Sequence, residues 1–269
     1  MRSRVLVSLV AAGFILPTPS EVTSAFGLKP ISLQQPQIHL PKGTIPEIAR
    51  QVTVRVFSSP RLAGSGVLIQ RQKQRYTVLT CAHVANLNQA ERYTVLTPDG
   101  QIHKAKRISW QLRDVDLALL EFNSADSYQI AILSEAAIEP KQLVYATGFP
   151  NYYDISPTRL EETFGWGPRA LRITQGTVSI VLTPRSLMQG YQLGYTNHVE
   201  LGMSGGAILN ASGELVGING RGSYPLSGIE AFQFTDGTFP PFRLFQQMEP
   251  LSWAIPTAVF QQSKLKLFL

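Results

Sequence analysis

The 269-residue sequence has 24 basic and 18 acidic side chains, a formal net charge of +6 and one cysteine. Charged residues make up only 16% of the chain and hydrophobic residues 44%, which excludes a disordered protein. A single cysteine excludes an intramolecular disulfide and a cysteine-rich zinc site, and we expect neither a metal nor a cofactor. The basic residues are spread along the chain rather than gathered into blocks, which argues against nucleic acid as a partner.

Residues 1–25 have the features of a signal peptide. Arg2 and Arg4 precede an apolar run over residues 5–16, and small residues follow at 23–25. The apolar run is shorter than a membrane-spanning helix. We therefore predict an exported protein, secreted or periplasmic, with no membrane span after cleavage. The alternatives are an uncleaved anchor and a buried N-terminal helix.

The remaining chain alternates between short β-type runs and turn residues. Residues 26–47 are rich in Pro, Gln and Lys without periodicity, and we predict a lead-in there. Strands are expected at 51–57, 66–70, 76–80, 93–96, 117–122, 143–147, 171–183, 207–209 and 215–218. Such short strands with few helical stretches predict one all-β domain over residues 48–269, a barrel or sandwich architecture. Residues 134–141 are the expected crossover between its two halves.

Three segments contain residue types that cooperate in nucleophilic catalysis. They are Thr80-Cys81-Ala82-His83, Asp114-Val115-Asp116 and Gly202-Met203-Ser204-Gly205-Gly206. A serine hydroxyl is a poor nucleophile unless a base removes its proton, and that base is usually a histidine held in one tautomer by a carboxylate. Glycine before the serine lets backbone N–H groups converge where a carbonyl oxygen would become negative. The segments predict a hydrolase with a serine nucleophile.

The order of these residues along the chain restricts the scaffold. The Gly-x-Ser-x-Gly pattern around Ser204 also matches the nucleophile elbow of α/β-hydrolases, which requires the histidine to follow the serine. All four histidines precede Ser204, which excludes that scaffold. The subtilisin order requires an aspartate before the histidine, but no aspartate precedes Asp99. Only the order His, Asp, Ser remains.

Further blocks surround these segments in a recognisable order. They are Gly64-Ser65-Gly66-Val67, Ala82-His83, Asp116-Leu117-Ala118-Leu119-Leu120, Gly202-x-Ser204-Gly205-Gly206, Gly213-Glu214-Leu215-Val216-Gly217-Ile218 and Trp253-Ala254-Ile255-Pro256. With them the sequence resembles the trypsin/chymotrypsin-like serine peptidases, and among these the bacterial disulfide-free branch that includes the Deg-type proteases. The resemblance implies two antiparallel β-barrels, about 48–135 and 140–269, with the active site in the cleft between them. We expect no appended peptide-tethering domain.

The resemblance implies an exported serine endopeptidase that hydrolyses peptide or protein substrates through an acyl-enzyme intermediate. It assigns catalysis to His83, Asp116 and Ser204, with the backbone N–H groups of Gly202 and Ser204 as the oxyanion hole. Asp114 is a rival for the role of Asp116, and Cys81 is expected to be a small buried residue. A different hypothesis is a non-catalytic module of the same fold that binds peptides in the cleft. The sequence leaves the oligomeric state open.

The resemblance also implies which residues form the pocket for the side chain before the cut bond. They are His198, Glu200, Asn219, Gly220 and Arg221. His198 takes the floor position, where trypsin has an aspartate, so trypsin-like cutting is not expected. Glu200 would attract a basic side chain and Arg221 an acidic one, and the preference stays open. The long segment 223–251 is expected to roof the cleft or to cover a barrel edge.

Overall fold

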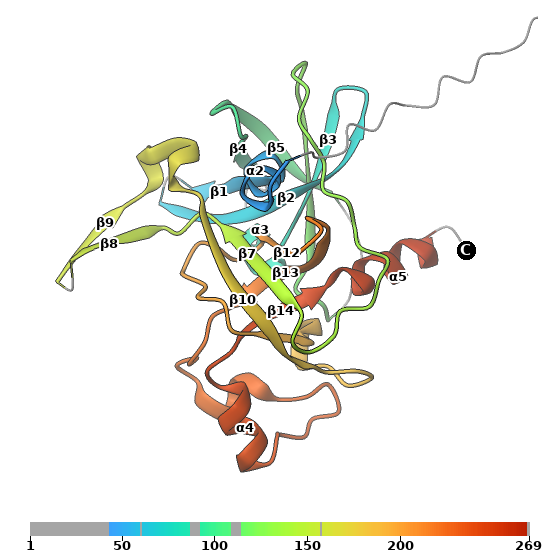
Figure 1. The fold of residues 1–269 in the computed structure, drawn as a ribbon. Coiled ribbons are helices and arrows are strands. Elements are labelled where there is room, and N and C mark those ends of the chain that lie inside the picture. The colour runs from blue at the N-terminus through green and yellow to red at the C-terminus, as the bar shows by residue number, and fades with distance from the viewer. Residues whose placement is uncertain (1–42, 60, 87–91, 109–113, 157, 268–269) are drawn as a thin grey trace, which may run out of the picture. The chain divides into compact units, whose positions relative to one another are not determined.

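Two closed antiparallel barrels of six strands each follow one another along the chain (Figure 1). The computed structural model describes residues 43–59, 61–86, 92–108, 114–156 and 158–267, and these belong to one compact unit. The predicted signal peptide and nearly all of the predicted lead-in lie outside the described residues. The predicted all-β class with two barrels is confirmed.

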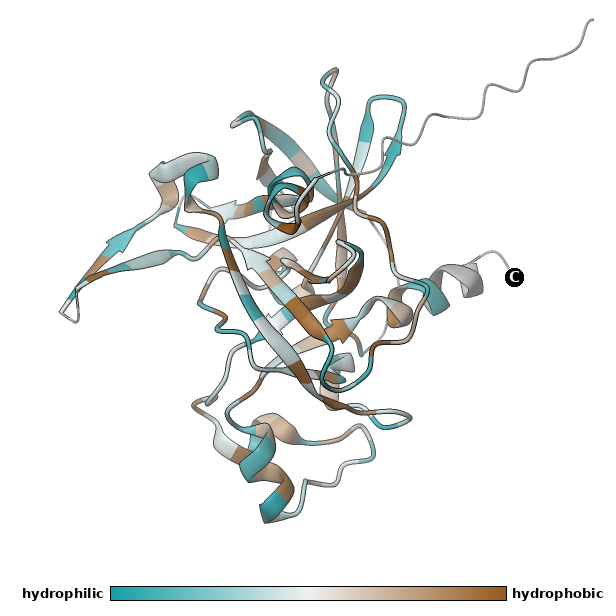
Figure 2. Ribbon diagram, viewed as in Figure 1, coloured by the Kyte–Doolittle hydropathy of each residue, from teal (hydrophilic) through white to brown (hydrophobic). Residues whose placement is uncertain are grey.

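The first barrel has the closed strand order β1-β2-β3-β6-β5-β4. Its strands are β1 (Thr53–Ser59), β2 (Leu62–Gln72), β3 (Arg75–Thr80), β4 (Arg92–Leu96), β5 (Ile102–Ile108) and β6 (Ala118–Asn123). Val, Leu and Tyr side chains from these strands fill the interior, because alternate residues of a strand point to the same face. Figure 2 shows apolar residues along the barrel strands, whereas the β2–β3 turn is polar.

The second barrel has the closed order β10-β11-β14-β13-β12-β7. Its strands are β7 (Leu143–Gly148), β10 (Arg172–Val181), β11 (Leu193–Tyr195), β12 (Ala207–Asn210), β13 (Leu215–Arg221) and β14 (Ser252–Pro256). The expected crossover 134–141 lies in the irregular segment between β6 and β7, and Ser134 donates its N–H to the Leu215 carbonyl of β13.

Short helices lie around the barrels. They are α2 (Ile45–Val52), α3 (Ala82–Ala85), η1 (Phe164–Ala170), η2 (Met188–Gly190), η3 (Gly228–Phe232), α4 (Phe242–Met248) and α5 (Thr257–Leu267). A capping box between Thr44 and Glu47 begins α2, whose Ile48, Ala49 and Val52 are buried in the core. The first expected strand therefore begins two residues late, at Thr53, because residues 51 and 52 complete this helix.

Two features project from the barrels. β8 (Tyr152–Ser156) and β9 (Arg159–Glu162) form a separate two-stranded arm that extends away from β7 (Figure 1). The segment 223–251 carries η3 and α4; within it, Phe232 is buried against Phe245 and against Trp253 of β14. This packing covers one end of the second barrel. No helix among the described residues has the length and apolar character needed to cross a membrane.

Candidate active site

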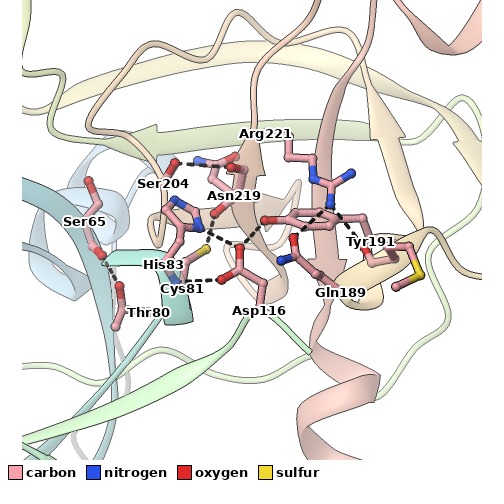
Figure 3. A network of polar contacts seen from close by, with 12 residues as sticks. Ser65, Thr80, Cys81, His83, Asp116, Gln189, Tyr191, Ser204, Asn219 and Arg221 are labelled. Carbon is pink, nitrogen blue, oxygen red and sulfur yellow. Dashed lines mark hydrogen bonds and ion pairs between the residues drawn. The ribbon is translucent and has the colours of Figure 1, made fainter. Parts of the chain in front are cut away.

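Strand pairing in the first barrel brings His83 and Asp116 together. β3 and β6 are antiparallel neighbours, and Thr80 at the end of β3 pairs with Ala118 at the start of β6. His83 follows β3 by three residues and Asp116 precedes β6 by two, so the two residues meet at the same end of this strand pair. The Nδ1 atom of His83 lies 2.6 Å from Oδ2 of Asp116, and the His83 backbone N–H donates to Oδ1 at 2.8 Å (Figure 3).

These contacts fix the tautomer of His83. A carboxylate only accepts hydrogen bonds, so Nδ1 must carry the proton and Nε2 is left as the basic nitrogen. The His83 side chain is 46% exposed, while that of Asp116 is only 4% exposed. The imidazole is thus half-exposed, with a buried carboxylate at its Nδ1 side.

The carboxyl group of Asp116 is ionised despite its burial. Burial raises the pKa of Asp116, but hydrogen bonds and the charge of His83, together with the Tyr191 hydroxyl, outweigh burial and hold that pKa below its ordinary value. Asp114, the rival aspartate, is exposed and has a positive φ of 63°. The structure therefore places Asp116, and not Asp114, against His83.

Ser204 lies in the loop before β12, and two glycines allow this loop to pass between the barrels. A Cβ on Gly205 would lie 2.1 Å from the Ser65 carbonyl oxygen, and a Cβ on Gly206 would lie 1.9 Å from that of Thr147. Gly205 also has a φ of +87°, which disfavours any other residue. The Ser65 N–H, in the first barrel, donates to the Ser204 carbonyl at 2.7 Å. Gly205 is thus required by close packing between the two barrels, and Gly206 by close packing against β7 within the second barrel.

Ser204 and the segment that carries His83 converge on one short stretch of β13. The Oγ of Ser204 donates to the Gly220 carbonyl at 3.3 Å, and the Sγ of Cys81, two residues before His83, contacts the carbonyl of the neighbouring Asn219 at 3.0 Å (Figure 3). A rotation about χ1 would turn Ser204 Oγ away from Gly220. The three predicted catalytic residues therefore share one site at the junction of the barrels.

The predicted oxyanion hole has two available donors. Within the part of the chain that the structure describes, neither the Gly202 N–H nor the Ser204 N–H donates to another protein group. Gly202 adopts a φ of +102°, and its carbonyl accepts a 2.8 Å hydrogen bond from the buried Ser65 hydroxyl. The sequence marks Ser65 only as part of a Gly-Ser-Gly-Val block, whereas in the structure its hydroxyl anchors this loop at the Gly202 carbonyl.

The five predicted pocket residues differ in what their side chains contact. His198 is exposed, and Glu200 is half-buried. The Asn219 side chain is fully buried, donating to the Thr147 carbonyl and accepting from the Tyr195 hydroxyl. The Arg221 guanidinium lies over the Tyr191 ring and donates to the Ala231 carbonyl. Gly220 has no side chain, and two of the other four residues, Asn219 and Arg221, are thus engaged in side-chain contacts within the protein.

Cys81, His83 and Asp116 also form a cluster whose donor atoms lie within 4.8 Å of one another. Burial raises the pKa of the Cys81 thiol well above its ordinary value, so the sulfur stays protonated and is a poor metal ligand. His83 Nδ1 is already engaged with Asp116. The cluster is therefore suited to proton transfer at His83 rather than to holding a cation.

Comparisons with known proteins identify the family of the domain. Residues 64–218 match the model of the trypsin-like peptidase domain. The chain is 33% identical over 159 residues to the periplasmic pH-dependent serine endoprotease DegQ of Escherichia coli, covering 58% of this chain and 30% of that protein. It is 32% identical over 165 residues to the serine endoprotease DegS of Salmonella typhimurium, covering 59% of this chain and 39% of DegS.

A solved structure supports the same fold. The crystal structure of the serine endoprotease from Yersinia pestis aligns with a TM-score of 0.55 and 24% identity, over 84% of this chain and 67% of that one. The matches to the curated relatives span less than half of those proteins' length. The family match covers more than half of this chain and contains His83, Asp116 and Ser204. This chain belongs to the family of trypsin-like peptidase domains.

Proposed function

We propose that this protein is an exported serine endopeptidase that hydrolyses peptide bonds with His83, Asp116 and Ser204. The observation that carries the proposal is the short contact between His83 Nδ1 and the buried Asp116 carboxylate. In the nearby serine loop, two backbone N–H groups donate to no protein group among the described residues. The names of the relatives, which are serine endoproteases, support the reaction class. Residues 1–25 and the periplasmic location in the DegQ name support export.

The reaction begins with proton transfer to His83. Its Nε2 takes the hydroxyl proton as Ser204 Oγ attacks the substrate carbonyl carbon, and the carbonyl oxygen becomes negative. The N–H groups of Gly202 and Ser204 donate to that oxygen. His83 then gives the proton to the leaving amine, the C–N bond breaks, and an ester to Ser204 remains. Water, deprotonated by His83, hydrolyses the ester and restores the enzyme.

Labelling with a fluorophosphonate probe tests the proposal, because the probe reacts with an activated serine regardless of substrate preference. We expect the wild-type chain to take up the label and the Ser204→Ala and His83→Ala variants to remain unlabelled. Ser212→Ala, at an exposed turn serine, is the matched control and should be labelled like the wild type.

Peptide-library cleavage then measures the activity and reveals the residue preference. We expect Ser204→Ala to lower kcat by about 10⁶, since residues of a triad act as a unit. A folded wild-type chain that takes up no label and cleaves no peptide would favour the peptide-binding module instead. Export is tested separately, by the mass of the exported product, which should begin near Phe26.

A further inference from the structure

Tyr191 contacts the triad from the second barrel. Its hydroxyl donates at 2.5 Å to Oδ2 of Asp116, the same oxygen that faces Nδ1 of His83 (Figure 3). Two residues earlier, the Gln189 carbonyl accepts the Asp116 backbone N–H at 2.9 Å. The carboxylate and the backbone of Asp116 are therefore both held by one short segment, which belongs to the other barrel.

The space for Tyr191 exists because residue 220 is a glycine. A Cβ on Gly220 would lie 2.2 Å from the Tyr191 hydroxyl oxygen and 2.4 Å from its Cε1. On the ring face, the Arg221 guanidinium carbon lies 4.1 Å from the ring centroid, and its Nη2 donates to Gln189 Oε1 at 3.0 Å. The ring is 1% exposed. Contacts on several sides thus hold the ring, and its hydroxyl donates to Asp116.

The ionisable groups around Tyr191 favour a neutral, donating hydroxyl. Cys81, His83, Asp116 and Arg221 face this region from the segments packed against it. Burial raises the pKa of Tyr191 well above its ordinary value, and the Asp116 charge adds to the effect. The Cys81 thiol is also kept neutral by burial. The Tyr191 hydroxyl therefore stays protonated and donates its hydrogen bond to the Asp116 anion.

We propose that Tyr191 is a positioning residue of the peptidase, whose hydroxyl, together with the Gln189 carbonyl, holds Asp116 in the orientation that aligns His83. The inference rests on the proposed function. Asp116 accepts three hydrogen bonds at its side chain, two from His83 and one from Tyr191. Tyr191 is the donor that comes from the second barrel, so its hydroxyl fixes the Asp116 carboxylate relative to that barrel.

The test is the Tyr191→Phe variant, which keeps the ring and removes only the hydroxyl. Hydrogen bonds to charged groups contribute about 1.5–3 kcal/mol, so we expect kcat to fall by tenfold or more with little change in KM. The carboxylate of the variant has one donor fewer, so the pKa of Asp116 rises and the carboxylate holds the proton at His83 Nδ1 more strongly. We therefore expect the acidic limb of the kcat/KM profile to move to higher pH.

Tyr76→Phe is the matched control. Tyr76 is a fully buried tyrosine of the first barrel, and its hydroxyl donates to the Asp126 carbonyl at 2.9 Å. It loses a buried hydroxyl in the same way but has no contact with Asp116 among its hydrogen bonds. We expect this variant to lose thermal stability while it retains the wild-type kcat and pH profile.

A spectroscopic measurement keeps the test independent of substrate. The proton between His83 Nδ1 and Asp116 should give a low-field ¹H NMR signal in the wild type and in Ser204→Ala, and this signal should shift in Tyr191→Phe. An unchanged signal, kcat and acidic limb in Tyr191→Phe would overturn the positioning role, as would an equal change in Tyr76→Phe. If instead the proposed peptidase function is wrong, the wild-type chain will not be labelled by fluorophosphonate, so the two failures can be told apart.

Discussion

Asp114 and Asp116 are separated by one residue, yet their surroundings differ completely. Asp116 is buried and accepts hydrogen bonds from His83 and Tyr191, whereas Asp114 is exposed in a left-handed turn conformation. An asparagine at 116 would offer an amide N–H to His83 Nδ1 and favour the wrong tautomer. We expect Asp116→Asn to lower kcat by about 10⁴.

Asp114→Asn is the matched control, with an expected loss of less than about tenfold, or roughly 1.4 kcal/mol. Both variants are to be measured at pH 7 to 8 on one peptide substrate, with thermal unfolding as a check on folding. If Asp114→Asn were the more damaged enzyme, the third catalytic role would pass to Asp114.

Ser65 makes a separate prediction about the oxyanion loop. Its hydroxyl accepts the Phe149 N–H at 2.8 Å and donates to the Gly202 carbonyl at 2.8 Å, so it links three segments. Ser65→Ala leaves a buried donor and a buried acceptor unpaired, and each costs about 1–3 kcal/mol. We expect a lower melting temperature and a kcat reduced by about tenfold, since the loop that carries the oxyanion donors loses its anchor.

Ser58→Ala serves as the control for Ser65→Ala, because Ser58 is also buried in the first barrel but donates to the Leu62 carbonyl. It should lower the melting temperature without a comparable loss of kcat. Equal kcat values in Ser65→Ala and the wild type, despite lower stability, would show that Ser65 acts on folding alone.

The sequence allowed the residues of the site to be selected, but not the hydrogen bonds that support them. Residue chemistry and chain order indicated the segments, the family resemblance assigned His83, Asp116 and Ser204, and the structure brings His83 and Asp116 into contact. Their catalytic roles stay predictions. Tyr191 lies in no distinctive sequence pattern, and Ser65 lies in a sequence block that does not reveal its hydrogen-bond partners; their partners are 75 and 137 residues away, respectively. Only the three-dimensional packing of the barrels identifies such partners.

At the scale of elements, the nucleophile loop depends on a glycine in β7. A Cβ on Gly148 would lie 2.7 Å from Met203 Cα and 2.9 Å from the Met203 carbonyl oxygen. These are backbone atoms of the loop before Ser204, so the loop itself would have to move. Overpacking typically costs about 1–3 kcal/mol. We expect Gly148→Ala to lower both stability and kcat.

Gly165→Ala is the control for Gly148→Ala, since no atom lies within 4 Å of a Cβ built on Gly165 in η1. This variant should match the wild type in kcat and in thermal unfolding. A Gly148→Ala enzyme with normal kcat would mean that the Met203 loop adapts without displacing Ser204.

The strands predicted from the sequence match those of the structure to different degrees, for physical reasons. Long apolar runs such as residues 76–80 and 143–147 correspond closely to β3 and β7, because buried barrel strands need apolar residues. The β8–β9 arm was not predicted, since nearly all of its residues are exposed and carry no apolar pattern. The three-residue β11 is too short to show any period. The aromatic residues of segment 223–251 indicated that it packs against the rest of the protein, but not where. In the structure, its Phe232 packs against Trp253 of the second barrel.

At the scale of the whole described structure, Arg55 of β1 joins the first barrel to the base of the β8–β9 arm. Its guanidinium is fully buried and donates to the Thr163 carbonyl at 2.8 Å, the Thr163 hydroxyl at 3.0 Å and Asn151 Oδ1 at 3.2 Å. The Arg55 Cζ atom lies 5.2 Å from the centroid of the Phe57 ring and 5.0 Å from that of the Phe164 ring. Burial lowers the pKa of Arg55 to about 10, so it remains charged at neutral pH.

Arg55 also reaches the active site through Asn151, whose backbone N–H donates to the Leu201 carbonyl at 2.8 Å, next to Gly202. A lysine at 55 would keep the charge but offer its donors from a single point, so it cannot satisfy acceptors spread around a planar fork. We expect Arg55→Lys to lower the free energy of unfolding by about 3 kcal/mol, the scale of one or two lost charge-assisted hydrogen bonds. We also expect kcat/KM to fall, as Asn151 loses its support beside the oxyanion loop.

Urea unfolding at pH 7 measures this effect, and Arg75→Lys is the matched control. Arg75 is 52% exposed and pairs with Glu121 at 3.4 Å, and exposed ion pairs contribute only about 0–1 kcal/mol.

The pKa of Arg55 also predicts how stability changes with pH. Because this pKa is lower in the folded chain, the unfolded chain binds the Arg55 proton more tightly than the folded one. Wild-type stability should therefore gain a contribution from Arg55 as pH rises above about 10, and this contribution should be absent in an Arg55→Met variant. Equal unfolding free energies for Arg55→Lys and Arg75→Lys would show that the buried guanidinium does not hold the arm to the barrel.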